Sequence, residues 1–381
     1  MDSFTFSCVK VVFGLDRIKE LDKEVRRVGG KKVVIITDIA MKRVGEEICE
    51  ILKEFDCELW SKVEPEPEIG IVDEVLNNTE FDTVVGVGGG STLDVAKLSA
   101  VAAGKGLNVS EFIGKELPER SAKLILCPTT AGTGSEVTKL AVFKIPGREV
   151  KYVFDSESLY ADIAVVDPKL TLSAPPEVTA NAGIDAICHA IEAYTSILAN
   201  PVTDMFAEQA IKIGAKAVRE AYSNGKNLKA RAEMSYASLL AGIAFNVAGT
   251  SLGHALGYAH SYIHKSPHGR SVGITMPYVL QYNAIADLEK HAKISQLLGV
   301  DVDGMSLRDA ALHSGVGFMK LLEDLCIPTK LFDVGASEDD VDEIVERIFL
   351  SERHVSRNPR VVKKDEMREL VKKAIYGTIY S

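Results

Sequence analysis

Short apolar, β-branched runs alternate with helix-like patterns through the first half of the chain, and this alternation constrains the fold more than any other feature. Such a run between turn-forming residues is typical of a buried strand. Strands that alternate with helices predict a parallel sheet covered by helices on both faces. The predicted strands are 33–37, 59–63, 83–87, 124–127 and 164–166, and the predicted helices lie around 44–52 and 71–76.

Strand patterns fade after Thr179, and the second half has helical spacing. One apolar face consists of Phe206, Ala210, Ile213 and Ala217. Ser337 and Asp340 form a capping box before another such stretch. The pair Pro175-Pro176 marks a domain boundary. We therefore predict an α/β fold class, with a Rossmann-like parallel-sheet domain over 1–176 and an all-helical domain over 177–381.

Length, charge and cysteine content limit the class of protein. The 381 residues suffice for two domains. A net charge of −10 argues against nucleic acid or an anionic membrane as a partner. No apolar run reaches the roughly 18 residues of a membrane span, and the N-terminal segment does not have the pattern of a signal peptide. The six cysteines include no CxxC pair, which predicts a reducing cytoplasm.

A glycine-rich loop, GVGGGSTLDVAK, follows the third predicted strand. Gly88, Gly89 and Gly90 lead into a helix, and Ser91 and Asp94 form a capping box at its start. Glycines before a helix N-terminus expose backbone N–H groups to a pyrophosphate. The alternative is a tight turn without a ligand. The number of glycines exceeds what a turn needs, so we predict a phosphate site.

Asp38 ends the preceding predicted strand. The usual dinucleotide motif has its acid about 20 residues after the glycines, whereas here the acid comes first. An acid at a strand end binds ribose hydroxyls and repels a 2′-phosphate. The alternative role for Asp38 is a helix N-cap, and the two roles are compatible.

A second polar loop, PTTAGTGSEVT, spans Pro128 to Thr138 directly after a strand. Such a loop is expected to wrap a nucleotide, the alternative being a surface turn. Its hydroxyl-bearing candidates are Thr129, Thr130, Thr133, Ser135 and Thr138.

A carboxylate and an imidazole share one face of a predicted helix in TANAGIDAICHAIEAY, at Asp185 and His189. One carboxylate with three imidazoles suits a divalent ion such as Fe(II) or Zn(II). Further imidazoles lie at His254, His260, His264 and His268. Periodicity does not choose among them, although Pro267 argues against a regular helix through the last two. The histidines expected to be solvated or structural are His291, His313 and His354.

Together the motifs resemble those of the iron-containing (group III) alcohol dehydrogenases, which have the dehydroquinate synthase-like fold. GGGSTLDVAK, PTTAGTGSEVT, AVVDPKLTLSAPP, TANAGIDAICHAIEAY, PHG and NPR occur in the family's order. The resemblance implies metal ligation by Asp185, His189, His254 and His268. It also implies a homodimer, and a cofactor that is NAD, with NADP as the alternative. The residues expected at the cofactor are Asp38, Gly88, Gly89, Gly90, Ser91, Asp94, Thr129, Thr130, Thr133, Ser135, Thr138 and Lys151, with Lys144 as the alternative register for the lysine.

The chain departs from the family at one position. Many members carry a second histidine four residues after the third ligand, near the nicotinamide, and here that residue is Tyr258. An unperturbed tyrosine has a pKa of about 10, against about 6.5 for histidine. The candidates for the catalytic proton relay are therefore Tyr258, His260 and His264.

The expected function is that of a metal-dependent, NAD(P)-linked alcohol dehydrogenase or aldehyde reductase. The NAD(P)-binding domain would be 1–176 and the metal-binding catalytic domain 177–381, with the metal acting as a Lewis acid on a small substrate in the cleft between them. The alternatives are a polyol or glycerol(-phosphate) dehydrogenase, a dehydroquinate synthase-like lyase, and a binding protein without turnover. The lyase would need several basic groups near the ligands, where the sequence offers only Lys265 and Arg270.

Overall fold

The computed structural model describes residues 4–106, 108–148 and 151–380. Contacts between Cα atoms divide the chain into two compact units. One unit is Ser7–Ala174, and the other contains residues 4–6 and 175–380. The division thus falls directly before the pair Pro175-Pro176.

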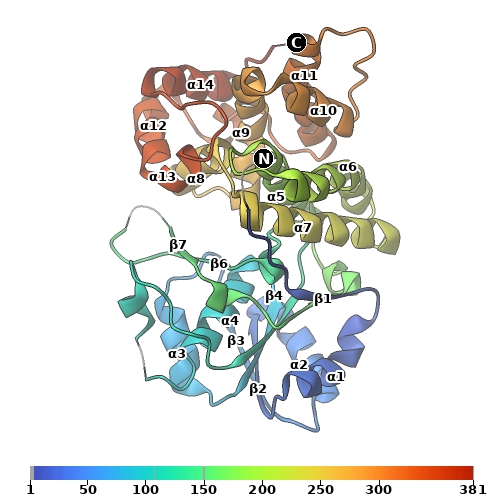
Figure 1. Cartoon of the computed structure of the whole chain (residues 1–381), viewed down its shortest axis with the longest axis vertical. Helices are drawn as coiled ribbons and strands as arrows, with labels where there is room; N and C mark the ends of the chain where they lie inside the picture. Colours follow the sequence, from blue (N-terminus) through green and yellow to red (C-terminus); the bar gives the residue numbers. More distant parts are fainter. Residues whose placement is uncertain (1–3, 107, 149–150, 381) are drawn as a thin grey trace. The chain divides into compact units, whose positions relative to one another are not determined.

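A six-stranded parallel sheet forms the centre of the unit Ser7–Ala174 (Figure 1), and its strand order is β1-β8-β5-β4-β2-β3. Its strands are β1 (Lys10–Phe13), β2 (Lys32–Asp38), β3 (Asp56–Val63), β4 (Thr83–Gly88), β5 (Lys123–Pro128) and β8 (Ile163–Val166). The predicted parallel sheet is confirmed. An antiparallel pair, β6 (Leu140–Phe143) and β7 (Tyr152–Asp155), is additional. Strands β1, β6 and β7 were not predicted from the sequence, because they are short and only partly buried.

Helices cover both faces of this sheet. They are α1 (Leu21–Val28), α2 (Lys42–Ile51), α3 (Gly70–Asn78) and α4 (Gly90–Ala102). Because strand side chains alternate between faces, Ile35 and Val85 pack with α1 and α2. On the other face, a Cβ at Gly86 would lie 2.7 Å from Ala96 of α4. Burial on both faces explains why the strands read as nearly continuous apolar runs.

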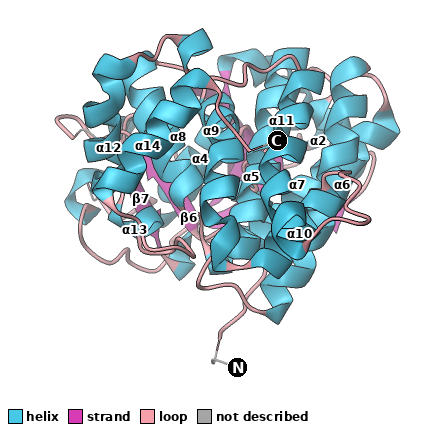
Figure 2. Ribbon diagram, turned by 90° about the horizontal axis from the view of Figure 1, so that it is seen from above, coloured by secondary structure: helices cyan, strands magenta, loops and turns pink. Residues whose placement is uncertain are grey.

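The described elements of residues 175–380 are all helical (Figure 2). They are α5 (Pro176–Thr195), α6 (Pro201–Ser223), α7 (Leu228–Ala248), α8 (Leu252–His264), α9 (His268–Asn283), α10 (Leu288–Leu297), α11 (Leu307–Asp324), α12 (Val341–Leu350), α13 (Glu352–Val355) and α14 (Lys364–Tyr376), with short 3-10 turns between some of them. The capping box of Ser337 and Asp340 before α12 is confirmed. So is the helix break near Pro267, because α8 ends at His264 and α9 begins at His268.

Among the described residues, no helix alone has the length and apolar composition needed to cross a membrane. Only α7 and α8 taken together would pass such a test, and they are bent by 104° relative to one another.

Candidate metal and cofactor sites

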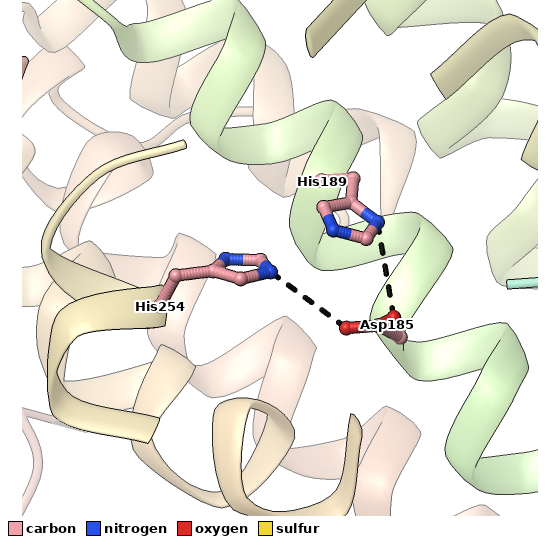
Figure 3. A group of neighbouring side chains, drawn as sticks. All are labelled: Asp185, His189 and His254. Carbon is pink, nitrogen blue, oxygen red and sulfur yellow. Dashed lines mark ion pairs between the residues drawn. The ribbon is translucent and has the colours of Figure 1, made fainter. Parts of the chain in front are cut away.

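Three helices bring together the residues that we call the ligand cluster, namely Asp185, His189, His254 and His268. Asp185 and His189 lie one turn apart on α5, whose middle is buried. His254 comes from the first turn of α8, and His268 is the first residue of α9. Figure 3 shows the side chains of Asp185, His189 and His254 pointing toward one another.

The spacing within the ligand cluster is longer than a hydrogen bond. Nε2 of His254 lies 3.7 Å and Nε2 of His268 lies 3.5 Å from Oδ1 of Asp185. Nδ1 of His189 lies 3.9 Å from Oδ2 of the same carboxylate. One potential ligand atom from each of Asp185, His189 and His254 lies within 4.8 Å of the others.

These distances fit a tetrahedral divalent ion. An ion bound at about 2.0–2.2 Å by nitrogen and oxygen ligands holds neighbouring ligand atoms about 3.4 Å apart. Asp185 is only 3% exposed, and a carboxylate buried to that extent is stable when a cation or donors compensate its charge. The donor set and its spacing therefore suit the ion that the sequence predicts.

Glu192 lies one turn beyond His189 on α5 and was not identified from the sequence. It follows Asp185 by seven residues, a spacing that returns to the same helix face. Its carboxylate accepts a hydrogen bond from Nδ1 of His254. Burial by itself would raise the pKa of Glu192 and lower that of His254, but their mutual attraction and hydrogen bonding reverse both directions. The heptad spacing from Asp185 was the signal that could have identified it.

Tyr258 lies beside the ligand cluster. Its ring centroid is 4.8 Å from that of His268 and 6.1 Å from that of His254. His354 of α13 lies 5.5 Å from Tyr258 and stacks on His254 at 6.3 Å. Of the two roles expected for His354, solvated or structural, its packing excludes the solvated one, and its distance in sequence from the other histidines gave no signal of these ring contacts. Burial lowers the pKa of His354 to about 3.

His260 and His264, the other two relay candidates, contact each other and a different set of residues. Their rings are 4.9 Å apart. Nδ1 of His260 lies 3.0 Å from the hydroxyl of Ser271, and Nε2 of His264 lies 3.5 Å from Asp340. Burial lowers the pKa of His260 to about 4, which favours the neutral ring. A role for either histidine in proton transfer stays a prediction.

The two polar loops of the unit Ser7–Ala174 meet at the carboxyl edge of its sheet. Strands β2, β4 and β5 are parallel neighbours, so the segments that follow them lie at one edge. The N–H of Thr129 donates to the carbonyl of Gly88 at 2.9 Å, which joins the loops. Asp38 ends β2 at this edge, and its carboxylate accepts from the N–H of Met41 as an N-cap. Ligands of open α/β sheets bind at such an edge, where the strand order reverses.

The three glycines at the start of α4, Gly88, Gly89 and Gly90, differ in what surrounds them. A Cβ at Gly88 would lie 2.5 Å from Thr92, and one at Gly90 would lie 2.7 Å from Thr133. Packing within the protein therefore explains these two glycines. A Cβ at Gly89 would meet nothing closer than 3.6 Å. Gly89 is also the N-cap of α4 and makes no side-chain cap, so it leaves the backbone open to a ligand that approaches closely.

A buried polar network connects the second polar loop, Pro128 to Thr138, to helix α4. Nζ of Lys97, on α4, donates to the hydroxyls of Ser135 at 2.8 Å and Thr138 at 3.1 Å, and to the carbonyl of Leu140 at 2.7 Å. The hydroxyl of Ser135 donates to Asp94 at 2.7 Å. Burial lowers the pKa of Lys97 to about 8 against the attraction of Asp94. Three predicted cofactor residues are thus engaged within the protein.

The predicted capping box of Ser91 and Asp94 is wrong, because both side chains have partners far along the chain. The hydroxyl of Ser91 accepts from the N–H of Glu66 at 3.0 Å. The carboxylate of Glu66 pairs with Lys151 at 2.6 Å and with Lys144 at 2.9 Å. Lys144 and Lys151, the two lysines expected near the cofactor, therefore both pair with Glu66, whose N–H contacts Ser91 of the glycine-rich loop.

Family models match nearly the whole chain. Residues 8–168 match the model described as iron-containing alcohol dehydrogenase. Residues 179–375 match the model described as Fe-containing alcohol dehydrogenase family, C-terminal.

Individual relatives match over nearly their full length. The sulfoacetaldehyde reductase of Bilophila wadsworthia is 34% identical over 376 residues, which cover 96% of this chain and 97% of the relative. The NAD-dependent methanol dehydrogenase of Bacillus methanolicus is 34% identical over 372 residues, with coverage of 96% and 97%. A crystal structure of 1,3-propanediol oxidoreductase superposes with a TM-score of 0.93 at 33% identity, covering 98% of this chain and 100% of that structure.

Proposed function

The chain belongs to the iron-containing alcohol dehydrogenase family, as its motifs predict, and from this membership we propose which of its residues carry the reaction. It is a metal-dependent oxidoreductase that interconverts alcohols and carbonyl compounds with a nicotinamide cofactor. We propose that the ligand cluster holds the metal, either Fe(II) or Zn(II). The observation that carries this proposal is the convergence of a buried carboxylate and three imidazoles at 3.5–3.9 Å. When bound, such an ion supplies Lewis-acid activation of the substrate oxygen, and the nicotinamide supplies the hydride chemistry.

We propose that the two loops at the carboxyl edge of the sheet bind the cofactor. The N–H groups of the first turn of α4 suit its pyrophosphate, and Gly89 leaves room for close approach. Asp38 suits the ribose hydroxyls and would repel a 2′-phosphate, so NAD is the proposed cofactor and NADP the alternative. Asp94, Ser135 and Thr138 hold the second loop in place, because their polar atoms bond within the protein.

The proposed substrate is a small alcohol or aldehyde. Two full-length relatives are named for methanol and for sulfoacetaldehyde. The phosphorylated substrate of a lyase is disfavoured, because the two nearby basic residues have other contacts. Lys265 lies over the ring of Tyr262 at 4.6 Å, and Arg270 lies 4.0 Å from Glu177. A homodimer and a cytoplasmic location are proposed as well, and the free thiols of all six cysteines agree with a reducing compartment.

Metal analysis of the purified protein, combined with turnover of NADH and NADPH across a panel of aldehydes, tests this function. We expect a divalent metal bound in a fixed ratio to protein, and oxidation of NADH that depends on both aldehyde and metal. Full turnover by metal-free protein would contradict the proposed metal centre, and the absence of aldehyde reduction by metal-loaded protein would contradict the proposed substrate class.

A further inference from the structure

We propose that Glu192 is a positioning residue of the metal centre, which holds His254 in the tautomer that presents Nε2 to the ion. This inference rests on the proposed ligand cluster and adds a residue that does not itself belong to the cluster. Glu192 lies on α5, and its partner His254 lies on α8, so one carboxylate connects two of the ligand-bearing helices.

The first carboxylate oxygen fixes the ring. Oε2 of Glu192 lies within hydrogen-bond reach of Nδ1 of His254. An ionised carboxylate only accepts, so the proton of this bond belongs to Nδ1. The lone pair of the neutral imidazole is then on Nε2, the atom that lies 3.7 Å from Oδ1 of Asp185. Carboxylate–histidine pairs orient metal-binding imidazoles in this way.

The second oxygen fixes the backbone that carries the ring. Oε1 of Glu192 accepts from the N–H of Ser251 at 3.1 Å, from its hydroxyl at 3.1 Å and from the N–H of His254 at 3.2 Å. Ser251 is the N-cap of α8 but makes no side-chain cap of its own. Glu192 therefore satisfies the N–H of His254, the third residue of α8, which an N-cap side chain usually satisfies.

The surroundings are shaped around this carboxylate. Glu192 is 1% exposed, so water has no access to replace it. A Cβ at Gly253 would lie 2.9 Å from Oε1 of Glu192 and 2.6 Å from the methyl carbon of Met276. A glycine at this position therefore leaves room for the carboxylate of Glu192 and the side chain of Met276 against the first turn of α8.

Glu192→Gln provides a sharp test, because it keeps the size of the side chain and changes only its hydrogen-bonding pattern. The three donors at Oε1 require the amide oxygen, which leaves the amide NH2 facing Nδ1 of His254. Nδ1 must then accept, so the ring proton moves to Nε2 and blocks it as a ligand. We expect the affinity for Co(II), measured by competition with a chelating dye, to fall by about 10- to 100-fold. We also expect a changed Co(II) absorption spectrum and an unchanged circular dichroism spectrum.

Two further variants complete the experiment. Glu208→Gln makes the same change at a glutamate that accepts from the hydroxyl of Tyr194 at 2.9 Å, and it should bind Co(II) like the parent. Gly253→Ala keeps Glu192 but displaces its carboxylate, and should weaken binding even if Glu192→Gln does not fold.

The outcomes separate this proposal from the metal centre on which it rests. Parent-like affinity in folded Glu192→Gln, or in folded Gly253→Ala, overturns the role of Glu192. A parent protein that binds Co(II) no better than His268→Ala overturns the ligand cluster instead.

Discussion

The ring of Tyr258 stacks on the ring of His268, with centroids 4.8 Å apart and planes inclined by 21°. Tyr258 thus packs directly on a residue of the ligand cluster, at the position where many family members carry histidine. We expect Tyr258→Phe to keep its metal and to retain kcat within about tenfold, because packing needs only the ring and an ordinary phenol is protonated at neutral pH and so does not accept the alcohol proton. Steady-state kinetics and metal analysis check this.

A relay through the phenol would give the opposite result. In that case Tyr258→Phe would lose about 10²–10⁴ in kcat with unchanged metal content. Tyr262→Phe is the matched control, because that ring lies on the same helix and is 42% exposed. His260→Ala and His264→Ala belong in the same series. A pH–rate inflection that disappears in only one of these two would identify that histidine as the relay.

Removing His268 should empty the metal centre. Its Nε2 lies 3.5 Å from Asp185, and an alanine there removes one of four proposed ligands. We expect His268→Ala to lose most of its metal and at least about 10²-fold in kcat/KM, since the Lewis acid is lost with the metal. Elemental analysis after dialysis measures the first effect. His313→Ala is the control and should behave like the parent, because Nδ1 of His313 bonds to the backbone carbonyl of Asp309. Wild-type metal content in His268→Ala would disprove the assignment of His268 as a metal ligand.

Neutralising Asp38 should allow the enzyme to use NADPH more efficiently. Asp38→Asn removes the charge that would face a 2′-phosphate and keeps an oxygen that can cap Met41. We expect kcat/KM for NADPH to rise by roughly 10- to 100-fold, the order of one relieved charge repulsion in a partly wet site. Asp56→Asn is the control, because Asp56 begins the parallel neighbouring strand β3 and lies at the other edge of the sheet from Asp38. A parent enzyme that already prefers NADPH would show that Asp38 does not select the cofactor.

Glu136 should make stability depend on pH. Burial raises the pKa of Glu136 to about 7, from a usual value of 4.5. Between these values the folded protein binds more protons than the unfolded chain, so stability falls as pH rises through this window. Glu136→Gln lacks the buried charge and should gain up to about 3 kcal/mol over the parent at pH 8, and nothing from this source at pH 4.

Chemical denaturation at several pH values measures that difference. Glu80→Gln, an exposed glutamate paired with Lys32, should show no such trend. A stability difference between Glu136→Gln and the parent that stays constant from pH 4 to pH 8 would show that the pKa of Glu136 is not raised in the folded protein.

The sequence by itself determined the strand and helix patterns and the chemical character of each motif. The β-branched runs predicted the parallel sheet, and the i, i+4 spacing placed Asp185 and His189 on one helix face. Both signals are local, because the periods of strand and helix are set by neighbouring backbone geometry. The break at Pro267 was predictable for the same reason, since proline acts on its own turn.

Only the tertiary structure decided which distant side chains meet. Periodicity did not choose among the later histidines, yet the fold brings His254 and His268 to Asp185 and leaves His260 against Ser271. Asp94 has a local capping pattern but bonds to Ser135, 41 residues away. Burial makes such long-range polar contacts important for stability, because a buried polar group without a hydrogen-bond partner costs far more free energy than a solvated one. The packing of the folded chain therefore determines which side chains become partners, and local sequence patterns do not predict these pairs.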